Sequence, residues 1–286
     1  MATASLSFDL LSDLRQLTAY PFMVHALEAG TVVAVMAGAV GWFMVLRRAS
    51  FAGHSLSVLA FPGATGALLA GLPAAAGYFG ACGAGALVIG VAGGSGARRS
   101  RSREAAVTGA VQAFGLACGF LFLSLYNGVL AGYESLLFGS FLGVSSGQVR
   151  TVALVTVAAL AFLAVAGRPL LFASVDDGVA RARGVPTRGL ALAFLLALGL
   201  AVAATAQITG VLLVFTLLVA PAATAQLITS RIGLSLVLSV LLGVLVTWVG
   251  LALAYFFGYP VGFYISTAAF VPYAVARLVR VVLDRR

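Results

Sequence analysis

Four side chains in this sequence have the chemistry to hold a metal ion or carry a proton within or beside an apolar run: His25, Glu28, His54 and Glu134. Imidazole is a common zinc ligand, and a carboxylate beside it widens the choice towards manganese or iron. His25 and Glu28 are three residues apart and therefore share one face of a helix. Inserting a charge into a bilayer costs at least about 2.5 kcal/mol, so such groups are expected to face the interior of a helical bundle or a water-filled route.

Each of these candidates also fits a structural role. His25 and Glu28 fit a hydrogen-bonded pair at the membrane interface, and His54 fits a helix cap or a hydrogen bond between helices. Glu134 fits an outer-rim residue that meets a delivery protein. Residue type and spacing leave both interpretations open.

The composition of the chain indicates which kind of secondary structure positions these residues. Of the 286 residues, 62% are hydrophobic and 9% are charged, and the mean hydropathy is +1.12. The apolar residues come in runs of about 20, the length at which a helix rising about 1.5 Å per residue crosses about 30 Å of hydrocarbon. The short alternating segments of membrane barrels are absent from the sequence. We therefore predict an all-α fold, a polytopic integral membrane helical bundle.

About nine spans fit this pattern, and residues 1–286 are predicted to form one transmembrane domain. The spans are placed at residues 22–46, 51–71, 74–95, 105–126, 150–168, 189–206, 208–228, 233–257 and 261–281. Residues 133–145 are apolar but too short to cross, which predicts a re-entrant or tilted segment on the outer side. Residues 1–20 carry leucines at helical spacing between charged residues, which predicts a segment lying on the membrane surface.

All 17 basic residues are arginine, and they gather in alternate breaks between the spans. If those breaks face the cytoplasm, fifteen arginines lie inside and only Arg15 and Arg150 lie outside. This bias orients membrane proteins, and it predicts a multi-pass cell-membrane protein with an external N-terminus and a cytoplasmic C-terminus. The basic charge is assigned to contact with the lipid bilayer, and no nucleic-acid partner is expected.

The sequence lacks the motifs of a catalytic or ATP-hydrolysing site. Without lysine it can form neither a P-loop of the usual kind nor a Schiff base, and it contains no His-Glu-x-x-His or Gly-x-Ser-x-Gly motif. We expect no catalytic residue, no enzymatic activity and no permanently bound cofactor. Uphill transport would need energy from another subunit, or from a proton gradient with His25 and Glu28 as proton carriers. A membrane enzyme is the third alternative, disfavoured because the sequence shows no catalytic constellation built on a nucleophile or on paired acids.

Residues 168–188 form the longest polar interruption within the chain. Pro169 and Pro186 bracket it, and each disfavours continuation of a helix. A short helix parallel to the membrane on the cytoplasmic face is predicted, as a docking site for a cytoplasmic partner, with a solvated loop as the alternative.

Prolines within two predicted spans indicate kinks. Pro62-Gly63 lies in the second span and Pro221 in the seventh. A proline within a membrane helix frees a carbonyl, so these positions are predicted to line a transport pathway or else to serve packing.

The polar interruption resembles the cytoplasmic coupling helix of permease subunits of zinc/manganese/iron-type metal ABC importers. An acidic start leading into Ala-x-x-x-Gly is matched here by Asp176, Asp177, Ala180 and Gly184. Residues 45–71, with their arginine pair, Ser57 and Pro62-Gly63, resemble the second-span signature of that family, and residues 210–229 and 259–267 resemble its late Pro-Ala-Ala-Thr-Ala span and last hairpin. The resemblance covers residues 20–282.

This resemblance implies the membrane-spanning permease of an ATP-driven importer of divalent transition-metal ions, zinc or manganese, with a pathway formed by a homodimer. It also implies separate cytoplasmic ABC ATPase subunits that bind residues 176–184, and an extracytoplasmic metal-binding protein. The family carries Asp-x-x-x-His on the second span, whereas His54 and Val58 stand at those two positions here. The metal site of the family is therefore not carried over intact.

Overall fold

The computed structural model describes residues 19–92, 101–126, 133–139 and 141–284, and these residues form helices without any strand. The predicted surface segment at residues 1–20 falls almost entirely outside the described residues. The long helices in chain order are α2 (Pro21–Leu46), α3 (Ser50–Leu69), α4 (Ala74–Ala92), α5 (Arg101–Leu125), α7 (Ser146–Val175), α9 (Thr187–Thr209), α10 (Val211–Ile228), α11 (Ile232–Phe257) and α12 (Val261–Asp284). Three short elements join them, namely α6 (Tyr133–Phe138), the 3-10 turn η2 (Phe141–Gly143) and α8 (Asp177–Ala182).

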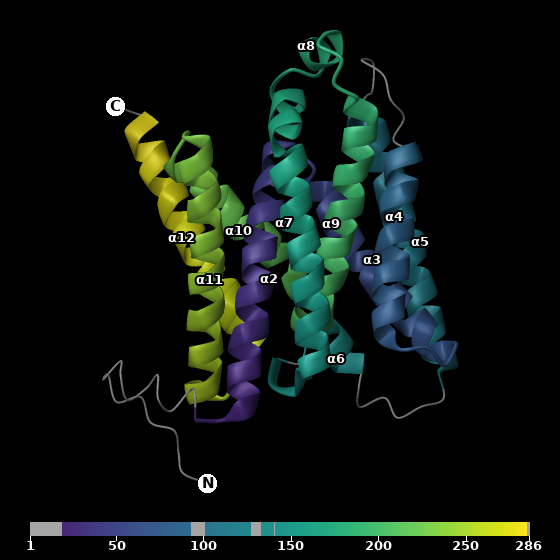
Figure 1. Cartoon of the computed structure of the whole chain (residues 1–286). Helices are drawn as coiled ribbons and strands as arrows, with labels where there is room; N and C mark the ends of the chain where they lie inside the picture. Colours follow the sequence, from purple (N-terminus) through teal and green to yellow (C-terminus); the bar gives the residue numbers. More distant parts are fainter. Residues whose placement is uncertain (1–18, 93–100, 127–132, 140, 285–286) are drawn as a thin grey trace.

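The long helices form the predicted bundle, with successive helices running in alternating directions (Figure 1). Eight of them are long and apolar enough to cross a membrane; α3 is the exception. It contains three polar residues that are buried, Ser55, Ser57 and Thr65, and it packs against α4, α5, α9 and α10. The polar side chains of α3 are therefore enclosed by neighbouring helices.

Helix α2 runs through the middle of the bundle and is tied to its neighbours by polar contacts. The indole nitrogen of Trp42 donates to Ser235 on α11 (2.9 Å), and the Trp42 carbonyl accepts from the Gln226 side chain on α10 (2.9 Å). Ser239 on α11 donates to the Gly38 carbonyl (2.8 Å). Such bonds between helices add to van der Waals packing, since lipid supplies no hydrophobic drive for helices to associate.

The closest approach between α3 and α4 depends on two glycines. A Cβ atom on Gly63 would collide with the Gly77 carbonyl and with Ala81, and a Cβ on Gly77 would collide with the Gly63 carbonyl. The two backbones are therefore in direct contact, as small residues permit in membrane bundles.

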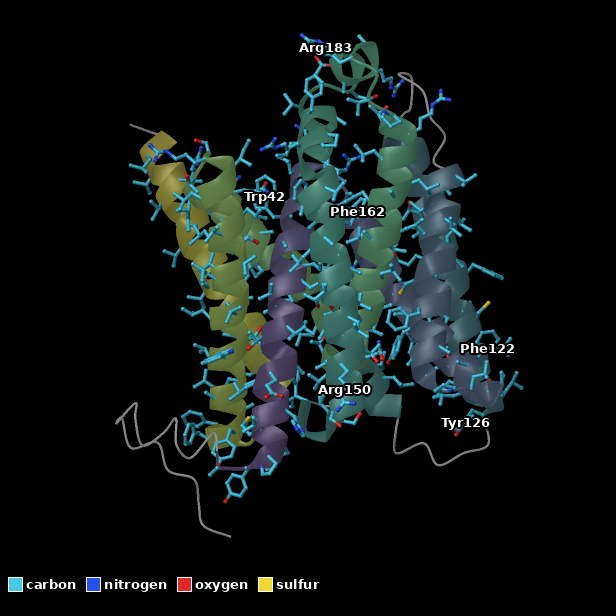
Figure 2. All side chains as sticks on the ribbon, in the orientation of Figure 1. Trp42, Phe122, Tyr126, Arg150, Phe162 and Arg183 are labelled. Carbon is cyan, nitrogen blue, oxygen red and sulfur yellow. The ribbon has the colours of Figure 1, made fainter. Side chains whose placement is uncertain are left out.

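The two ends of the bundle differ in charge. The arginines on the side of α8 whose side chains the structure describes are Arg47, Arg48, Arg168, Arg181, Arg183, Arg188, Arg231, Arg277 and Arg280. Arg150 lies at the opposite end, within the second turn of α7, as Figure 2 shows by its separation from Arg183. We refer to these as the arginine-rich end and the opposite end.

The structure corrects one prediction about Pro169. This residue does not end a helix, because α7 continues through it to Val175. The missing proline N–H costs one helical hydrogen bond. Beyond the proline, Leu170 is fully buried and the hydroxyl of Ser174 bonds to the Leu170 carbonyl, so packing offsets that cost. The described part of residues 133–145 forms α6 and η2, in agreement with the prediction that this segment does not cross.

Candidate functional site

His54 lies on α3 where this helix meets α10. Its ring packs edge-on against that of Phe215, with 4.9 Å between the ring centroids and 66° between the ring planes. Its Nδ1 atom is buried and has no hydrogen-bond partner in the described part of the chain. A buried polar atom without a partner is unfavourable, and a neutral imidazole nitrogen is a good cation ligand. His54 therefore places an unpaired ligand atom at a contact between two helices.

His54 and Phe215 occupy equivalent positions near the starts of their helices. Each residue is the fifth of its helix, about 6 Å along from the first. Helix α3 begins on the arginine-rich side, whereas Gly210, just before α10, abuts the end of α6 at the opposite end (Figure 1). The two helix starts must therefore overlap along the bundle. Sequence reasoning missed Phe215, since no periodicity relates residues so far apart in the chain.

The two prolines of the predicted pathway lie within α3 and α10. Pro62 and Pro221 are both buried within their helices. Pro62 follows His54 by eight residues, about 12 Å towards the opposite end, whereas Pro221 follows Phe215 by six residues, about 9 Å towards the arginine-rich end. The pair therefore lies on either side of the His54–Phe215 contact, separated along the bundle by up to about 20 Å.

His25 and Glu28 lie in the first two turns of α2, at the opposite end. His25 is half-buried and Glu28 is exposed. Neither makes a hydrogen bond or an ion pair within the described residues. Glu134 belongs to α6, but its side chain is outside the described part of the structure. The described residues contain no group of three or more potential metal ligands, so the four candidates are not brought together in one chain.

The predicted coupling residues form a compact structure at the arginine-rich end, which we call the α8 segment (residues 176–184). The Asp176 carboxylate caps α8 by accepting from the Val179 N–H (2.9 Å), and Asp177 pairs with Arg181. Ala180 is fully buried, so it fixes the inner face of α8. Gly184 ends the segment in a left-handed conformation, with φ of +81°.

The α8 segment is exposed on its outer side, where Figure 1 shows it projecting beyond the neighbouring helices. Val179 is 46% exposed. The arginine Nε of Arg181 donates to the Thr187 hydroxyl at the start of α9 (3.0 Å), which fixes the return of the chain into the bundle. A capped helix on two short connections can bind a partner without unfolding.

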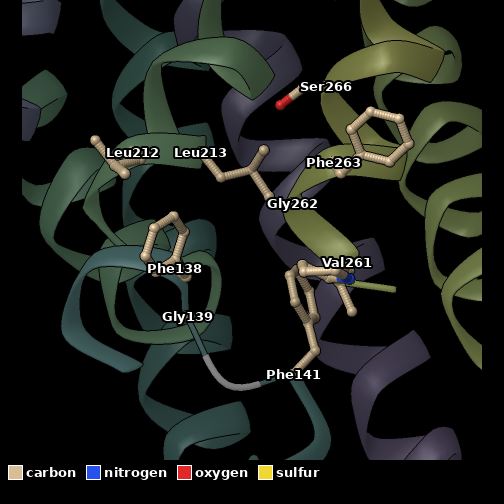
Figure 3. A pocket seen from close by; sticks show the side chains of 10 residues that line it. Phe138, Gly139, Phe141, Leu212, Leu213, Val261, Gly262, Phe263 and Ser266 are labelled. Carbon is tan, nitrogen blue, oxygen red and sulfur yellow. The ribbon is translucent and has the colours of Figure 1, made fainter. Parts of the chain in front are cut away.

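A cavity of about 560 Å³ opens at the opposite end, between the α6 region, the start of α10 and the α11–α12 hairpin (Figure 3). Its lining is mainly apolar, with Phe138, Phe141, Leu213 and Phe263 around it, and Ser266 supplies a hydroxyl. Divalent manganese and iron prefer oxygen and nitrogen ligands. The described residues that line this cavity therefore do not supply the side chains of a metal site.

Comparisons with known proteins agree with this architecture. A sequence model described as the ABC 3 transport family matches residues 19–280. The manganese transport system membrane protein MntC of Halalkalibacterium halodurans is 30% identical over 234 residues, covering 80% of this chain and 77% of that protein. The chelated iron transport system membrane protein YfeC of Yersinia pestis is 28% identical over 237 residues, covering 83% and 79%.

A solved structure shows the same fold. A chain of PsaBC from Streptococcus pneumoniae, determined in complex with Fab, superposes with a TM-score of 0.82 at 25% sequence identity. The match covers 93% of this chain and 95% of the other. The helical bundle predicted from hydropathy is therefore that of a solved membrane-protein fold.

Proposed function

The chain belongs to the ABC 3 transport family, and from this premise we propose that it is the membrane-spanning permease of an ATP-driven importer for divalent transition-metal ions. The observation that carries the proposal is the capped α8 segment projecting from the arginine-rich end, in a chain without lysine and hence without a P-loop of its own. Separate ABC ATPase subunits bind this segment and supply the energy. The permease itself performs no chemistry.

The cargo is a first-row divalent metal. Relatives named for manganese and chelated iron transport support manganese or iron, and the imidazole of His54 is equally suited to zinc. One imidazole cannot hold a cation alone, and a single chain gathers no further ligands among its described residues. Two copies therefore line one pathway as a homodimer, so that each contributes its His54.

The arginine-rich end faces the cytoplasm, because basic residues are retained on that side of cell membranes. The start of α2 and the α6 segment then lie on the outer side. An extracytoplasmic metal-binding protein delivers the ion there, and Glu134 is a contact for it. The apolar surface between the two ends is covered by the lipid bilayer.

The test is transport by the reconstituted complex. The chain is co-expressed with candidate ATPase and binding-protein subunits, purified in mild detergent and placed in vesicles, and uptake of radioactive manganese is measured with and without ATP. ATP-dependent uptake that persists in the presence of an uncoupler is expected. Uptake abolished by the uncoupler under sustained ATP would instead favour a proton-coupled transporter that uses His25 and Glu28.

His54 has a matched control on the same helix. His54→Ala is expected to reduce uptake by about tenfold or more, the loss typical of removing support from a metal site. Val58→Ala, one turn further along α3, is expected to leave uptake within about twofold, because valine cannot coordinate a metal. Equal amounts of folded protein are verified by gel filtration. Wild-type uptake by His54→Ala would remove this residue from the pathway.

A further inference from the structure

Arg47 lies where three helices meet beside the α8 segment. It follows the last residue of α2, and its Nη1 donates to the Ser174 hydroxyl at the end of α7 (3.2 Å). Its guanidinium carbon lies 5.2 Å from the ring centre of Phe194 on α9, a ring that is 1% exposed. Guanidinium groups are stabilised over such aromatic faces. One side chain thus joins the ends of α2 and α7 to α9.

The charge of Arg47 also faces the α8 segment. Burial lowers the pKa of Arg47, and the nearby carboxylate of Asp177 partly offsets this effect. The ordinary pKa of a guanidinium is so high that the group stays charged. A half-buried cation is favourable only while its partners remain in place. Movement of α7, α8 or α9 relative to Arg47 therefore carries an electrostatic penalty.

The backbone beyond Arg47 leads directly to the candidate pathway. Arg48 adopts a left-handed conformation with φ of +57°, and the N–H groups of Arg48 and Ala49 bond to the carbonyls of Val45 and Met44. These bonds close α2 in a tight turn. Helix α3 begins at Ser50 and carries His54 one turn later. Because the turn is short and hydrogen-bonded, a displacement of Arg47 is passed to the start of α3.

We propose that Arg47 is a positioning residue for coupling: it holds the helix ends on either side of the α8 segment against the α2–α3 turn, so that movement imposed on the α8 segment reaches α3. This inference rests on the proposed function. It assigns to one side chain a role in transmission that is separate from binding the ATPase, and it predicts loss of coupling without loss of the complex.

The test compares Arg47→Met with Arg48→Met, which removes an exposed charge from the adjacent position. In reconstituted complexes, Arg47→Met is expected to keep ATPase binding and ATP hydrolysis but to lower the manganese transported per ATP by about tenfold, as for loss of a charge-assisted hydrogen bond. Arg47→Lys retains the charge, and its manganese transport per ATP should lie between those of Arg47→Met and Arg48→Met. Equal transport per ATP in Arg47→Met and Arg48→Met, or no difference between the Lys and Met variants, would overturn the proposal.

A second measurement needs no ATPase, so it separates this inference from the proposed function. Spin labels on cysteines at Val179 and at Ile232, both exposed, report the distance between the α8 segment and α11 in the purified chain. Cys118 is replaced by alanine beforehand, and Cys82 is buried. Arg47→Met should broaden the distance distribution and Arg48→Met should not. Ser174→Ala removes only the hydrogen-bond acceptor of Arg47 and should broaden the distance distribution to a smaller extent. It serves as the test variant if Arg47→Met folds poorly. Distance distributions that stay unchanged in both Arg47→Met and Ser174→Ala would refute the positioning role.

Discussion

Substituting Gly184 tests whether the α8 segment depends on its backbone conformation. The N–H of Gly184 bonds to the Arg181 carbonyl (2.9 Å), and the N–H of Val185 bonds to the Ala180 carbonyl (3.0 Å). This pattern needs the left-handed conformation at Gly184, where φ is +81°. No atom lies within 4 Å of the position that a Cβ would take. A new side chain is therefore penalised through the backbone and not through a collision.

The size of the effect follows from that penalty. An L-residue in the left-handed region costs roughly 1–2 kcal/mol, and a factor of ten corresponds to about 1.4 kcal/mol. Gly184→Val should reduce the population of the folded α8 segment by about tenfold or more, because a β-branched side chain tolerates this region least. Gly184→Ala should reduce the population of the folded α8 segment less than Gly184→Val does. Gly184→Asn should change the population by less than about threefold, since asparagine enters this region readily.

Limited proteolysis measures this population. Trypsin cleaves after arginine, and Arg181 and Arg183 lie within the α8 segment, so the cleavage rate there reports local opening. Cleavage is expected to be fastest in Gly184→Val, slower in Gly184→Ala, and slowest in Gly184→Asn and the wild type. Asparagine is larger than alanine, so a steric mechanism would give the reverse order for these two variants. Faster cleavage of Gly184→Asn than of Gly184→Ala would refute the backbone argument.

Three further results are expected. Gly77→Ala should lower the stability of the detergent-solubilised protein by about 1–3 kcal/mol, because the new Cβ meets the backbone of α3. Gly80→Ala on the same helix meets nothing within 4 Å and should be neutral or stabilising. Equal melting temperatures of the two variants would contradict the close approach of α3 and α4. Asp176→Ala should cost about 1 kcal/mol as a lost helix cap, seen as faster hydrogen exchange in α8, while Asp176→Asn should behave like the wild type. A cysteine at Val179 should react with a membrane-impermeant maleimide only after cells are permeabilised, and labelling of intact cells would place the α8 segment outside.

Hydropathy sufficed for the bundle because a membrane span is defined by length and apolarity within one continuous run. Helix α2 illustrates this, since the predicted span at residues 22–46 and the observed Pro21–Leu46 differ by one residue. Residues 150–168 illustrate the limit. The observed α7 is 30 residues long because contacts beyond Pro169, made by Leu170 and Ser174, depend on neighbours that the local pattern does not contain.

The candidate site was less accessible to sequence reasoning. Residue type identified His54, but its contact with Phe215 depends on how α3 packs against α10, which the local sequence pattern does not encode. Arg47 entered the sequence argument only as one member of a charge cluster. Its half-buried side chain and its contacts with Ser174 and Phe194 depend on three helix ends converging, which no spacing in the chain encodes.

The overlap of α3 and α10 exposes the His54–Phe215 contact to displacements from both ends of the bundle. On one side, α3 starts three residues after Arg47, so under the proposed role of Arg47 a displacement of the α8 segment would reach His54 through about one helical turn. On the other side, α10 starts at Gly210, packed against the end of α6, so displacement of the outer segment reaches Phe215 through a similar length of helix. Packed helices shift as rigid elements between discrete arrangements. Under the proposed function, the crossing of these two helix starts is therefore the point in the chain at which ATPase movement and delivery of the metal at the outer face would act on the same pair of side chains.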